Sequence, residues 1–324
     1  MTRKSDIQGS DVTRRVALKA AVAVPALGMM TRAVPAAARQ ADFLVAVADG
    51  VWMHQGDTET FSRDNGGDIA NVAVFATDDG ALVVDAGSSR AFSEQLRAEV
   101  EIRCGGLAAT ILTHHHPDHT FGTQALADRP IIAQPATAAK VEANLVDYAD
   151  LLYREVGLPM RGTEPVLPNQ SIAPGLLTVG GRRFEVLALA GHTEADLALL
   201  DIATGTLVAG DLLFLDRAPT VPDADLATWH ASLDRLAALA PAAAIPGHGP
   251  VDRRGAAVRQ TRAYLDWLAA RLADAADRGL GMIEAMHEAP PAEWAALGAN
   301  PGEFRRSVVQ TYAAYETEAL PLLR

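Results

Sequence analysis

The sequence is nearly without cysteine, since Cys104 is the only one among 324 residues. A single thiol cannot form a disulfide within the chain, and it cannot build the cysteine-rich, closed site that usually holds a structural zinc ion. Cys104 follows Phe92, Leu96 and Val100 at steps of four, as on one face of a helix. This spacing predicts a buried small side chain rather than a ligand or a nucleophile.

Basic residues are also scarce, and the formal net charge is −12. Six of the 28 Lys and Arg but only two of the 40 Asp and Glu lie in residues 1–38, so the rest of the chain carries 22 basic residues against 38 acidic ones. Binding to phosphate groups requires a basic surface. The composition therefore argues against a nucleic-acid substrate and favours a small molecule.

A hydrophobic run long enough to cross a membrane is missing from the N-terminal region. The run that ends at Met30 contains Pro25 and is shorter than the roughly 20 residues that a spanning helix needs. It follows the pair Arg14-Arg15 and precedes Ala36-Ala37-Ala38, which resembles a twin-arginine export signal with a small-residue cleavage site. Residues 1–38 are therefore expected to be a signal peptide that directs the protein to the periplasm, with retention as a membrane anchor as the alternative.

What the chain does have is a dense histidine motif, His114-His115-His116-Pro117-Asp118-His119. A regular helix would spread these side chains around its circumference, and a straight strand would send His119 to the opposite face from His114 and His116. Pro117 also disfavours a helix that continues through this point. The apolar, β-branched segment 109–113 reads as a strand, so the motif is expected to form a tight loop at the end of that strand.

Three later segments repeat this design. Each is an apolar, strand-like run followed by glycine and one His or Asp: 184–190 before Gly191-His192, 206–209 before Gly210-Asp211, and 243–246 before Gly247-His248. Glycine lets the backbone turn sharply, so that a ligand can point away from the strand end. Four such strand ends predict one rim of His and Asp side chains with room for two metal ions.

The set of seven residues resembles the metallo-β-lactamase-fold hydrolase superfamily. By that resemblance His114, His116 and His192 would hold a first metal ion, and Asp118, His119 and His248 a second. Asp211 would bridge the two ions. Asp85 would help to order the metal loop from outside the ligand set, although a turn or capping role fits the residue equally well.

The expected fold is α+β, a four-layer αββα sandwich. Residues 39–255 would form the catalytic domain, and residues 256–324 a helical C-terminal extension that packs on the body or promotes oligomerisation. The basic pair Arg305-Arg306 in this extension is expected to lie on a solvated face. His54 is expected at the surface of a strand, and His115, between two ligands, is expected to point away from the metal.

The resemblance implies a hydrolase with two zinc ions per chain, although imidazole and carboxylate ligands also suit iron or manganese. Two such ions lower the pKa of a shared water toward about 7, which makes hydroxide available to attack an ester, thioester, lactone or amide carbonyl. Asp118 would bind metal and orient the nucleophile. Substrate contacts are open; Phe214, Leu215 and Arg217, just beyond Asp211, are candidates for the pocket wall.

Several alternatives remain on the sequence alone. The place of Asp211 is usually Cys or Ser in lactamases of this fold, which makes β-lactam hydrolysis a secondary interpretation. Segments 68–71, 162–164, 210–214 and 246–250 are most similar to the exported zinc metallohydrolases associated with quinoprotein and sulfur-oxidation systems. A mononuclear iron persulfide dioxygenase and a non-catalytic metal-binding partner of a periplasmic enzyme are the other two possibilities.

Overall fold

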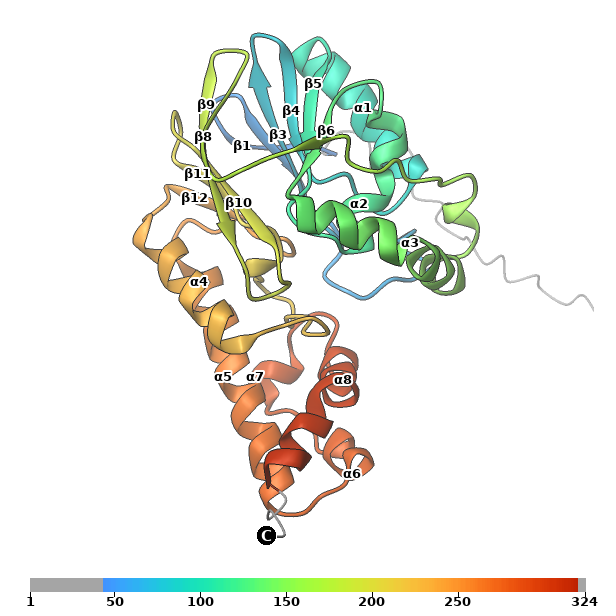
Figure 1. Cartoon of the computed structure of the whole chain (residues 1–324), viewed down its shortest axis with the longest axis vertical. Helices are drawn as coiled ribbons and strands as arrows, with labels where there is room; N and C mark the ends of the chain where they lie inside the picture. Colours follow the sequence, from blue (N-terminus) through green and yellow to red (C-terminus); the bar gives the residue numbers. More distant parts are fainter. Residues whose placement is uncertain (1–42, 320–324) are drawn as a thin grey trace, which may run out of the picture. The chain divides into compact units, whose positions relative to one another are not determined.

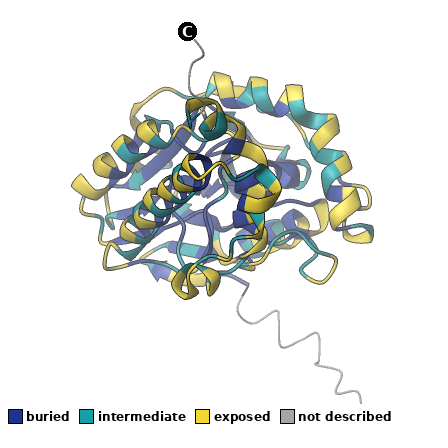
Figure 2. Ribbon diagram, turned by 90° about the horizontal axis from the view of Figure 1, so that it is seen from below, coloured by how far each residue is buried: buried dark blue, intermediate teal, exposed yellow. Residues whose placement is uncertain are grey.

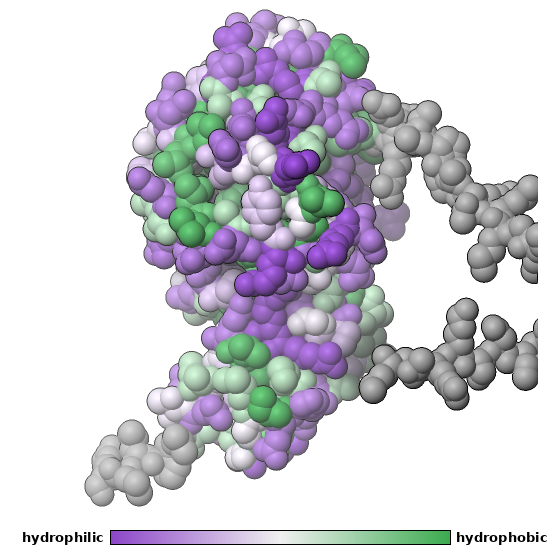
Figure 3. Space-filling model, turned by 90° about the vertical axis from the view of Figure 1, so that its right-hand side faces the viewer, coloured by the Kyte–Doolittle hydropathy of each residue, from purple (hydrophilic) through white to green (hydrophobic). Residues whose placement is uncertain are grey.

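A computed structural model describes residues 43–319 of the chain. The expected signal peptide, residues 1–38, lies outside the described residues. Within residues 43–319, none of the helices combines the length and the apolar character needed to cross a membrane. On the face drawn in Figure 3, hydrophobic side chains form separate groups among hydrophilic ones.

Two β-sheets form the centre of the fold (Figure 1). The first sheet has its strands in chain order: β1 Val45–Ala48, β2 Val51–His54, β3 Val72–Thr77, β4 Gly80–Val84, β5 Leu107–Ile111, β6 Ile131–Ala133 and β7 Gln170–Ser171. Strands β1 to β4 pair antiparallel, and β4 to β7 pair parallel. The parallel half therefore places the C-terminal ends of β4, β5 and β6 at one edge of the sheet.

The second sheet has the order β12-β11-β10-β9-β8. Its strands are β8 Gly175–Val179, β9 Arg182–Leu189, β10 Asp196–Asp201, β11 Thr206–Val208 and β12 Ala243–Ile245. Strands β8 to β11 are antiparallel, and β11 pairs parallel with β12. The loops that follow β9, β11 and β12 carry the later histidine and aspartate residues of the predicted site.

Helices cover the outer faces of both sheets (Figure 1). The helices of the first half are α1 Arg90–Cys104, α2 Pro117–Thr120 and α3 Pro135–Glu155. Those of the second half are α4 Leu226–Ala238, α5 Ala256–Asp277, α6 Met282–His287, α7 Ala292–Ala295 and α8 Gly302–Ala319. Figure 2 shows the consequence, with buried strands inside and exposed residues on the outer sides of the helices.

Strand periodicity explains the layers, because successive side chains of a strand point to opposite faces of a sheet. In β3, Ala73 and Phe75 pack in the core between the sheets, whereas Val72 and Val74 pack with the apolar side of α1. The core between the sheets also contains residues of the second sheet such as Phe184. The expected four-layer αββα arrangement is confirmed.

The C-terminal helices share a core with the second half of the sandwich. Tyr264 of α5 and Phe304 and Tyr312 of α8 are buried in one cluster with Trp229 of α4. The extension thus packs on the body, as one of the two expectations stated. Cys104, expected to be buried, is partly buried: it packs against the core under α1, and its place at the end of that helix leaves it near the surface.

The sequence pattern missed two strands. β1 is four residues long with two exposed side chains, and β7 is two exposed residues within a proline-rich segment that reads as loop. Both lie at the edges of the first sheet. Edge strands of this length have little apolar periodicity, so tertiary pairing rather than local sequence defines them.

Candidate metal centre

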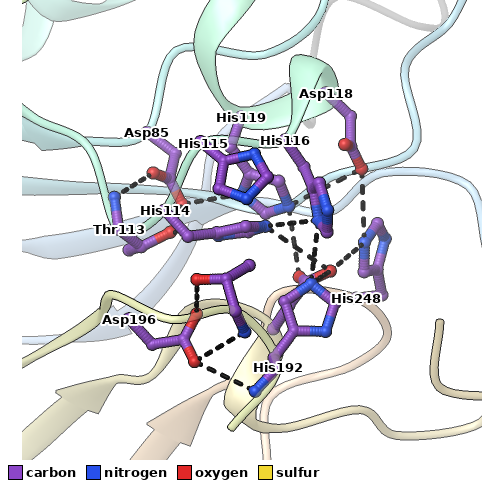
Figure 4. A network of polar contacts seen from close by, with 12 residues as sticks. Asp85, Thr113, His114, His115, His116, Asp118, His119, His192, Asp196 and His248 are labelled. Atoms are coloured by element: carbon purple, nitrogen blue, oxygen red, sulfur yellow. Dashed lines mark hydrogen bonds and ion pairs between the residues drawn. The ribbon is translucent and has the colours of Figure 1, made fainter. Parts of the chain in front are cut away.

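Four strand ends bring seven His and Asp side chains to one edge of the sandwich (Figure 4). The loop after β5 carries His114 and His116, and Pro117 begins the short helix α2, which carries Asp118 and His119. The loops after β9 and β12 bring His192 and His248 opposite them. The loop after β11 brings Asp211 to 3.3 Å from each of these two imidazoles. All seven predicted residues therefore meet, and all seven are buried.

The first group of donors is made of three imidazoles and a carboxylate. His116 Nδ1 lies 3.1 Å from His114 Nε2 and 2.9 Å from His192 Nε2. Asp211 Oδ2 lies 3.3 Å from His192 Nε2 and 3.9 Å from His114 Nε2. Ligand nitrogens about 2.0–2.1 Å from one zinc ion would be separated by distances of this size.

The second group lies on the other side of Asp211. His119 Nε2 is 3.1 Å from Asp211 Oδ1, and His248 Nε2 is 3.3 Å from Asp211 Oδ2. Asp118 Oδ2 completes the group at 3.3 Å from His248 Nε2 and 3.6 Å from His119 Nε2. The carboxylate of Asp211 therefore faces both groups, where a bridging ligand would be.

Hydrogen bonds on the outer side of these imidazoles fix their tautomers. His119 Nδ1 donates to Asp85 Oδ2 at 2.8 Å, and His248 Nδ1 donates to the carbonyl of Ile69 at 2.7 Å. Thr113 Oγ1 donates to Asp85, so it accepts from His114 Nδ1. The Nε2 atoms of His114, His119 and His248 then carry lone pairs that point at carboxylates and at each other.

Such an arrangement of inward lone pairs is unfavourable unless a cation lies among them. His119 Nε2 and Asp211 Oδ1 are both buried and have no hydrogen-bond partner among the described residues. Buried polar atoms are nearly always paired, so unpaired atoms that converge on one point indicate a ligand. The donor set, with no thiolate, fits zinc and also iron or manganese.

Electrostatics also indicate that the site attracts a cation, which can be a proton on His119 or a metal ion. Burial lowers the pKa of His119, but the carboxylates of Asp211, Asp118 and Asp85 raise it well above its ordinary value. Burial raises the pKa of Asp211, but the imidazoles of His248, His119 and His192 lower it well below its ordinary value. The carboxylate of Asp211 is therefore ionised, and it supplies negative charge of the kind that divalent cations require.

Asp85 has the ordering role that the resemblance implied. One carboxylate oxygen accepts from the backbone N–H of Thr113 at 2.8 Å, and the other accepts from the Thr113 hydroxyl and from His119. Asp85 has a φ of 68°, an uncommon value for a residue other than glycine. The alternative of a simple turn or cap does not account for these three contacts, which orient two of the predicted ligands.

Gly247 packs directly against the carboxylate of Asp211. A Cβ atom at Gly247 would lie 1.9 Å from Asp211 Oδ1, so no larger residue fits there without moving the carboxylate. The backbone N–H of Gly247 also donates to the carbonyl of Gly210 at 2.7 Å. The close approach of the two loops depends on this glycine.

A cavity of about 230 Å³ opens over the metal-facing residues. His116, Asp118, Asp211 and His248 line one side of it. The rest of the lining is mixed and consists of the apolar Phe61, Ile69, Pro117, Leu151 and Pro222, the polar Thr60, Tyr148, Thr220 and Gln310, the acidic Asp223, and the basic Arg217 and Arg306. This volume is below the 300–1,000 Å³ typical of sites for drug-sized ligands, which favours a small substrate.

Among the pocket-wall candidates, the structure places Arg217 in the cavity lining. Phe214 instead stacks on His248 from the protein interior, with ring centroids 5.2 Å apart, and does not line the cavity. Leu215 does not line it either. Arg306 of the C-terminal extension does; both residues of this basic pair are exposed, as expected, and Arg306 lies at the cavity as well.

Two further residues near the site, Asp223 and Tyr148, were not found from the sequence. Asp223 Oδ2 lies 3.1 Å from His116 Nε2, the nitrogen that faces away from the first donor group. The Tyr148 hydroxyl, at the cavity wall, is 2.8 Å from His115 Nδ1. His115 points away from the two donor groups, as expected, and it is buried beside Tyr148.

His54 is also buried, contrary to the expectation of a surface residue. Its Nδ1 lies 3.0 Å from the carbonyl of Phe43, and its Nε2 lies 2.8 Å from Asp68 Oδ1. This pairing spans residues that are fourteen positions apart, so strand periodicity alone could not reveal it. It fixes the segment just before Ile69, whose carbonyl orients His248.

The family model of the metallo-beta-lactamase superfamily matches residues 65–248, more than half of the chain. The chain belongs to the metallo-beta-lactamase superfamily. The matched region ends at His248 and includes all seven predicted ligands. This membership confirms the broad resemblance on which the sequence interpretation was based.

Several curated members of the superfamily are similar in sequence. The probable metallo-hydrolase YqjP of Bacillus subtilis is 26% identical over 217 residues, which cover 56% of this chain and 68% of that protein. A hydroxyacylglutathione hydrolase of Halorhodospira halophila is 35% identical over 204 residues, covering 61% and 60%. The chain spans about half to two thirds of the length of the curated relatives it matches.

Solved structures of the superfamily share the fold. A metallo-beta-lactamase from Pontibacter korlensis superposes with a TM-score of 0.56 at 20% identity, over 69% of this chain and 98% of that chain. A metallo-beta-lactamase from Hirschia baltica gives a TM-score of 0.53 at 21% identity. These similarities confirm the fold, and the named relatives support the prediction of a metal-dependent hydrolase.

Proposed function

We propose that the protein is a hydrolase with two divalent metal ions, preferably zinc, that cleaves an ester, thioester, lactone or amide carbonyl of a small molecule. The observation that carries this proposal is the pair of donor groups on either side of Asp211, both opening on one cavity. His114, His116 and His192 would hold one ion. Asp118, His119 and His248 would hold the other, with Asp211 between the two.

Two bound ions supply an acidified water and a Lewis acid for the substrate carbonyl oxygen. The protein contributes position and proton handling. Asp118 lines the cavity as an ionised carboxylate, because His119 and His248 lower its pKa more than burial raises it. It can therefore accept a hydrogen bond from the attacking water and orient it. Tyr148 presents a hydroxyl, held by His115, on the same wall.

The alternative functions differ in whether they need the second donor group as metal ligands. A mononuclear iron persulfide dioxygenase would use one set of ligands, whereas Asp118, His119 and His248 form a second convergent set. This observation favours the binuclear hydrolase. A β-lactam hydrolase would use both sets, and β-lactams therefore belong in the first substrate panel.

The decisive experiment combines metal analysis with a variant of His116. Elemental analysis of protein purified without chelators should give nearly two zinc ions per chain, and a panel of esters, thioesters, lactones and β-lactams should identify turnover. His116→Ala should lose both metal and hydrolysis. The matched control is His287→Ala, because His287 is an exposed histidine on α6 that is far along the chain from all ligands.

Each outcome bears on the proposal. One iron per chain together with oxygen uptake would replace it with the dioxygenase. A full metal complement without turnover of any panel member would favour a non-catalytic metal-binding protein. A His116→Ala variant that hydrolyses normally without metal would refute the assignment of the site.

We also infer that residues 1–38 export the protein to the periplasm, on the basis of Arg14-Arg15, the short apolar run and Ala36-Ala37-Ala38. Fractionation of cells that carry wild type or an Arg14→Lys, Arg15→Lys variant tests this, since the variant should accumulate in the cytoplasm. A partnership with a periplasmic quinoprotein or sulfur-oxidation system is a further proposal from the resemblance. Affinity purification from the periplasm tests it.

A further inference from the structure

Arg217 is a buried arginine without a counter-ion. The residue is only 3% exposed, and its Nε atom is buried with no hydrogen-bond partner. Within residues 43–319, its guanidinium forms no hydrogen bond, and no carboxylate oxygen lies within 4.0 Å of it. A buried charge is costly unless it is paired, so a guanidinium held in this way indicates a partner that is not part of the described chain.

The position of Arg217 shows where that partner would bind. Arg217 lines the same cavity as Asp118, Asp211 and His248. At about 230 Å³ the cavity is small enough for one compact molecule to reach both the guanidinium and the metal-facing residues. The guanidinium is planar and matches a carboxylate with two parallel N–H···O bonds.

The backbone around Arg217 is fixed, which suits a preorganised binding group. Arg217 forms a β-bridge with Gly298 of the C-terminal extension. The N–H of Ala218 donates to the carbonyl of Gly298, and the N–H of Gly298 donates to the carbonyl of Asp216. Arg306 of α8 lines the cavity as a second cation, but it is half exposed and already lies 3.6 Å from Glu303.

We propose that Arg217 binds a carboxylate group of the substrate, so that the enzyme acts on small anionic esters, thioesters or lactones. This inference rests on the proposed hydrolase function and specifies its substrate class. The bound carboxylate is separate from the carbonyl that is cleaved, and it fixes the orientation of the substrate over Asp118. Arg306 adds longer-range attraction at the rim.

The test uses a matched pair of substrates with the zinc-loaded protein. The anionic member is 3-acetoxybenzoate, and the neutral member is 3-acetoxybenzamide; the meta position prevents the carboxylate from assisting the reaction itself. Wild type should prefer the anionic ester by about 10- to 100-fold in kcat/KM, the effect expected of a charge-assisted bidentate contact. Arg217→Gln should abolish that preference and leave the neutral ester within about threefold of wild type.

The matched control is Arg305→Gln, because Arg305 is an exposed neighbour of Arg306 that does not line the cavity. It should retain the full preference. Arg217→Lys keeps the charge without the bidentate geometry and should recover only part of the effect. If Arg217→Gln lowers kcat/KM equally for both esters, the proposed carboxylate subsite is wrong, whereas the proposed hydrolase function is unaffected.

Binding measurements make the test independent of turnover. Calorimetry with 3-hydroxybenzoate and 3-hydroxybenzamide should show a preference for the carboxylate in wild type that is lost in Arg217→Gln. A preference that persists in the variant would assign the carboxylate to the metal ions and overturn the proposal. Tighter binding of 3-hydroxyphenyl phosphate than of 3-hydroxybenzoate, lost in the same variant, would replace carboxylate with phosphate.

A stability readout separates ligand binding from a structural role. Arg217→Met removes the unpaired charge and keeps the length of the side chain. If the guanidinium serves the substrate, the thermal unfolding midpoint of this variant should equal or exceed that of wild type. A lowered midpoint would mean that Arg217 holds the fold together, and the subsite would be refuted.

Discussion

Two arginines of this protein, the partly buried Arg182 and the buried Arg217, have opposite surroundings. Arg182, at the start of β9, donates to Asp201 through Nε and Nη2 and to the carbonyls of Gly50 and Ala76 through Nη1. Arg217, in the cavity wall, has no such partner within the described residues. The first joins the two sheets at the end of the sandwich away from the metal loops. The second is available to a ligand.

The difference shows how to distinguish structural from functional charge. A buried charge whose donors are all used stabilises the arrangement of the chain around it, and breaking it leaves a buried partner uncompensated. A buried charge whose donors are unused costs stability, and it persists where binding a ligand offsets that cost. The first kind should be sensitive to mutation in unfolding experiments, and the second in binding experiments.

The comparison predicts the largest loss of folding stability for a substitution of Arg182. Arg182→Met leaves Asp201, whose side chain is fully buried, without its counter-ion and frees two backbone carbonyls. The free energy of unfolding should fall by about 3–5 kcal/mol. Chemical denaturation followed by circular dichroism measures this change. The metal content of the folded variant should stay at the wild-type value.

A smaller effect, on metal affinity, is expected at Asp85, whose carboxylate hydrogen-bonds to Thr113 and His119 beside the metal centre. Asp85→Asn keeps the shape but weakens the acceptors for His119 and Thr113. Metal affinity should fall about 10- to 100-fold, because partners behind the ligands commonly have effects of this size. Competition with a fluorescent chelator measures the affinity. An unchanged affinity would show that Asp85 only shapes the turn.

The smallest expected effect is the pH dependence of the Arg182–Asp201 pair. Burial raises the pKa of Asp201, but hydrogen bonds from Arg182 and Thr204 lower it overall. A carboxyl group with a lowered pKa in the folded state contributes stability above its unfolded pKa of about 3.9, and this contribution is lost as the pH falls through the folded value. A double-mutant cycle with Arg182→Met and Asp201→Asn should give a coupling of about 1–2 kcal/mol at pH 7 that disappears at low pH.

The metal-facing residues could be predicted from the sequence because the pattern that indicates them lies within a few neighbouring residues. Each ligand follows an apolar strand and, for the later three, a glycine, so the pattern itself gives the place in the fold. His114, Asp211 and His248 illustrate this, since each lies at a strand end in the structure. The αββα layers followed in the same way from strands that alternate with amphipathic helices.

The rest of the site depends on contacts between distant segments. Asp223 reaches His116 across 107 residues, and Arg217 stands beside Gly298 across 81. No periodicity or spacing encodes such pairs. A charge that lacks a partner is even harder to find, because the sequence shows which arginines exist but not which of them remain unpaired after folding.

The bridge between Arg217 and Gly298 has a consequence for how this enzyme could change over time. The predicted metal ligands lie before Val251, whereas Arg306 and Gly298, which supports Arg217, belong to the C-terminal extension. Replacement of the C-terminal helices could therefore alter which molecules are accepted while the hydrolytic machinery is inherited unchanged. A library confined to residues 282–319 is a natural starting point for redirecting the protein to new compounds.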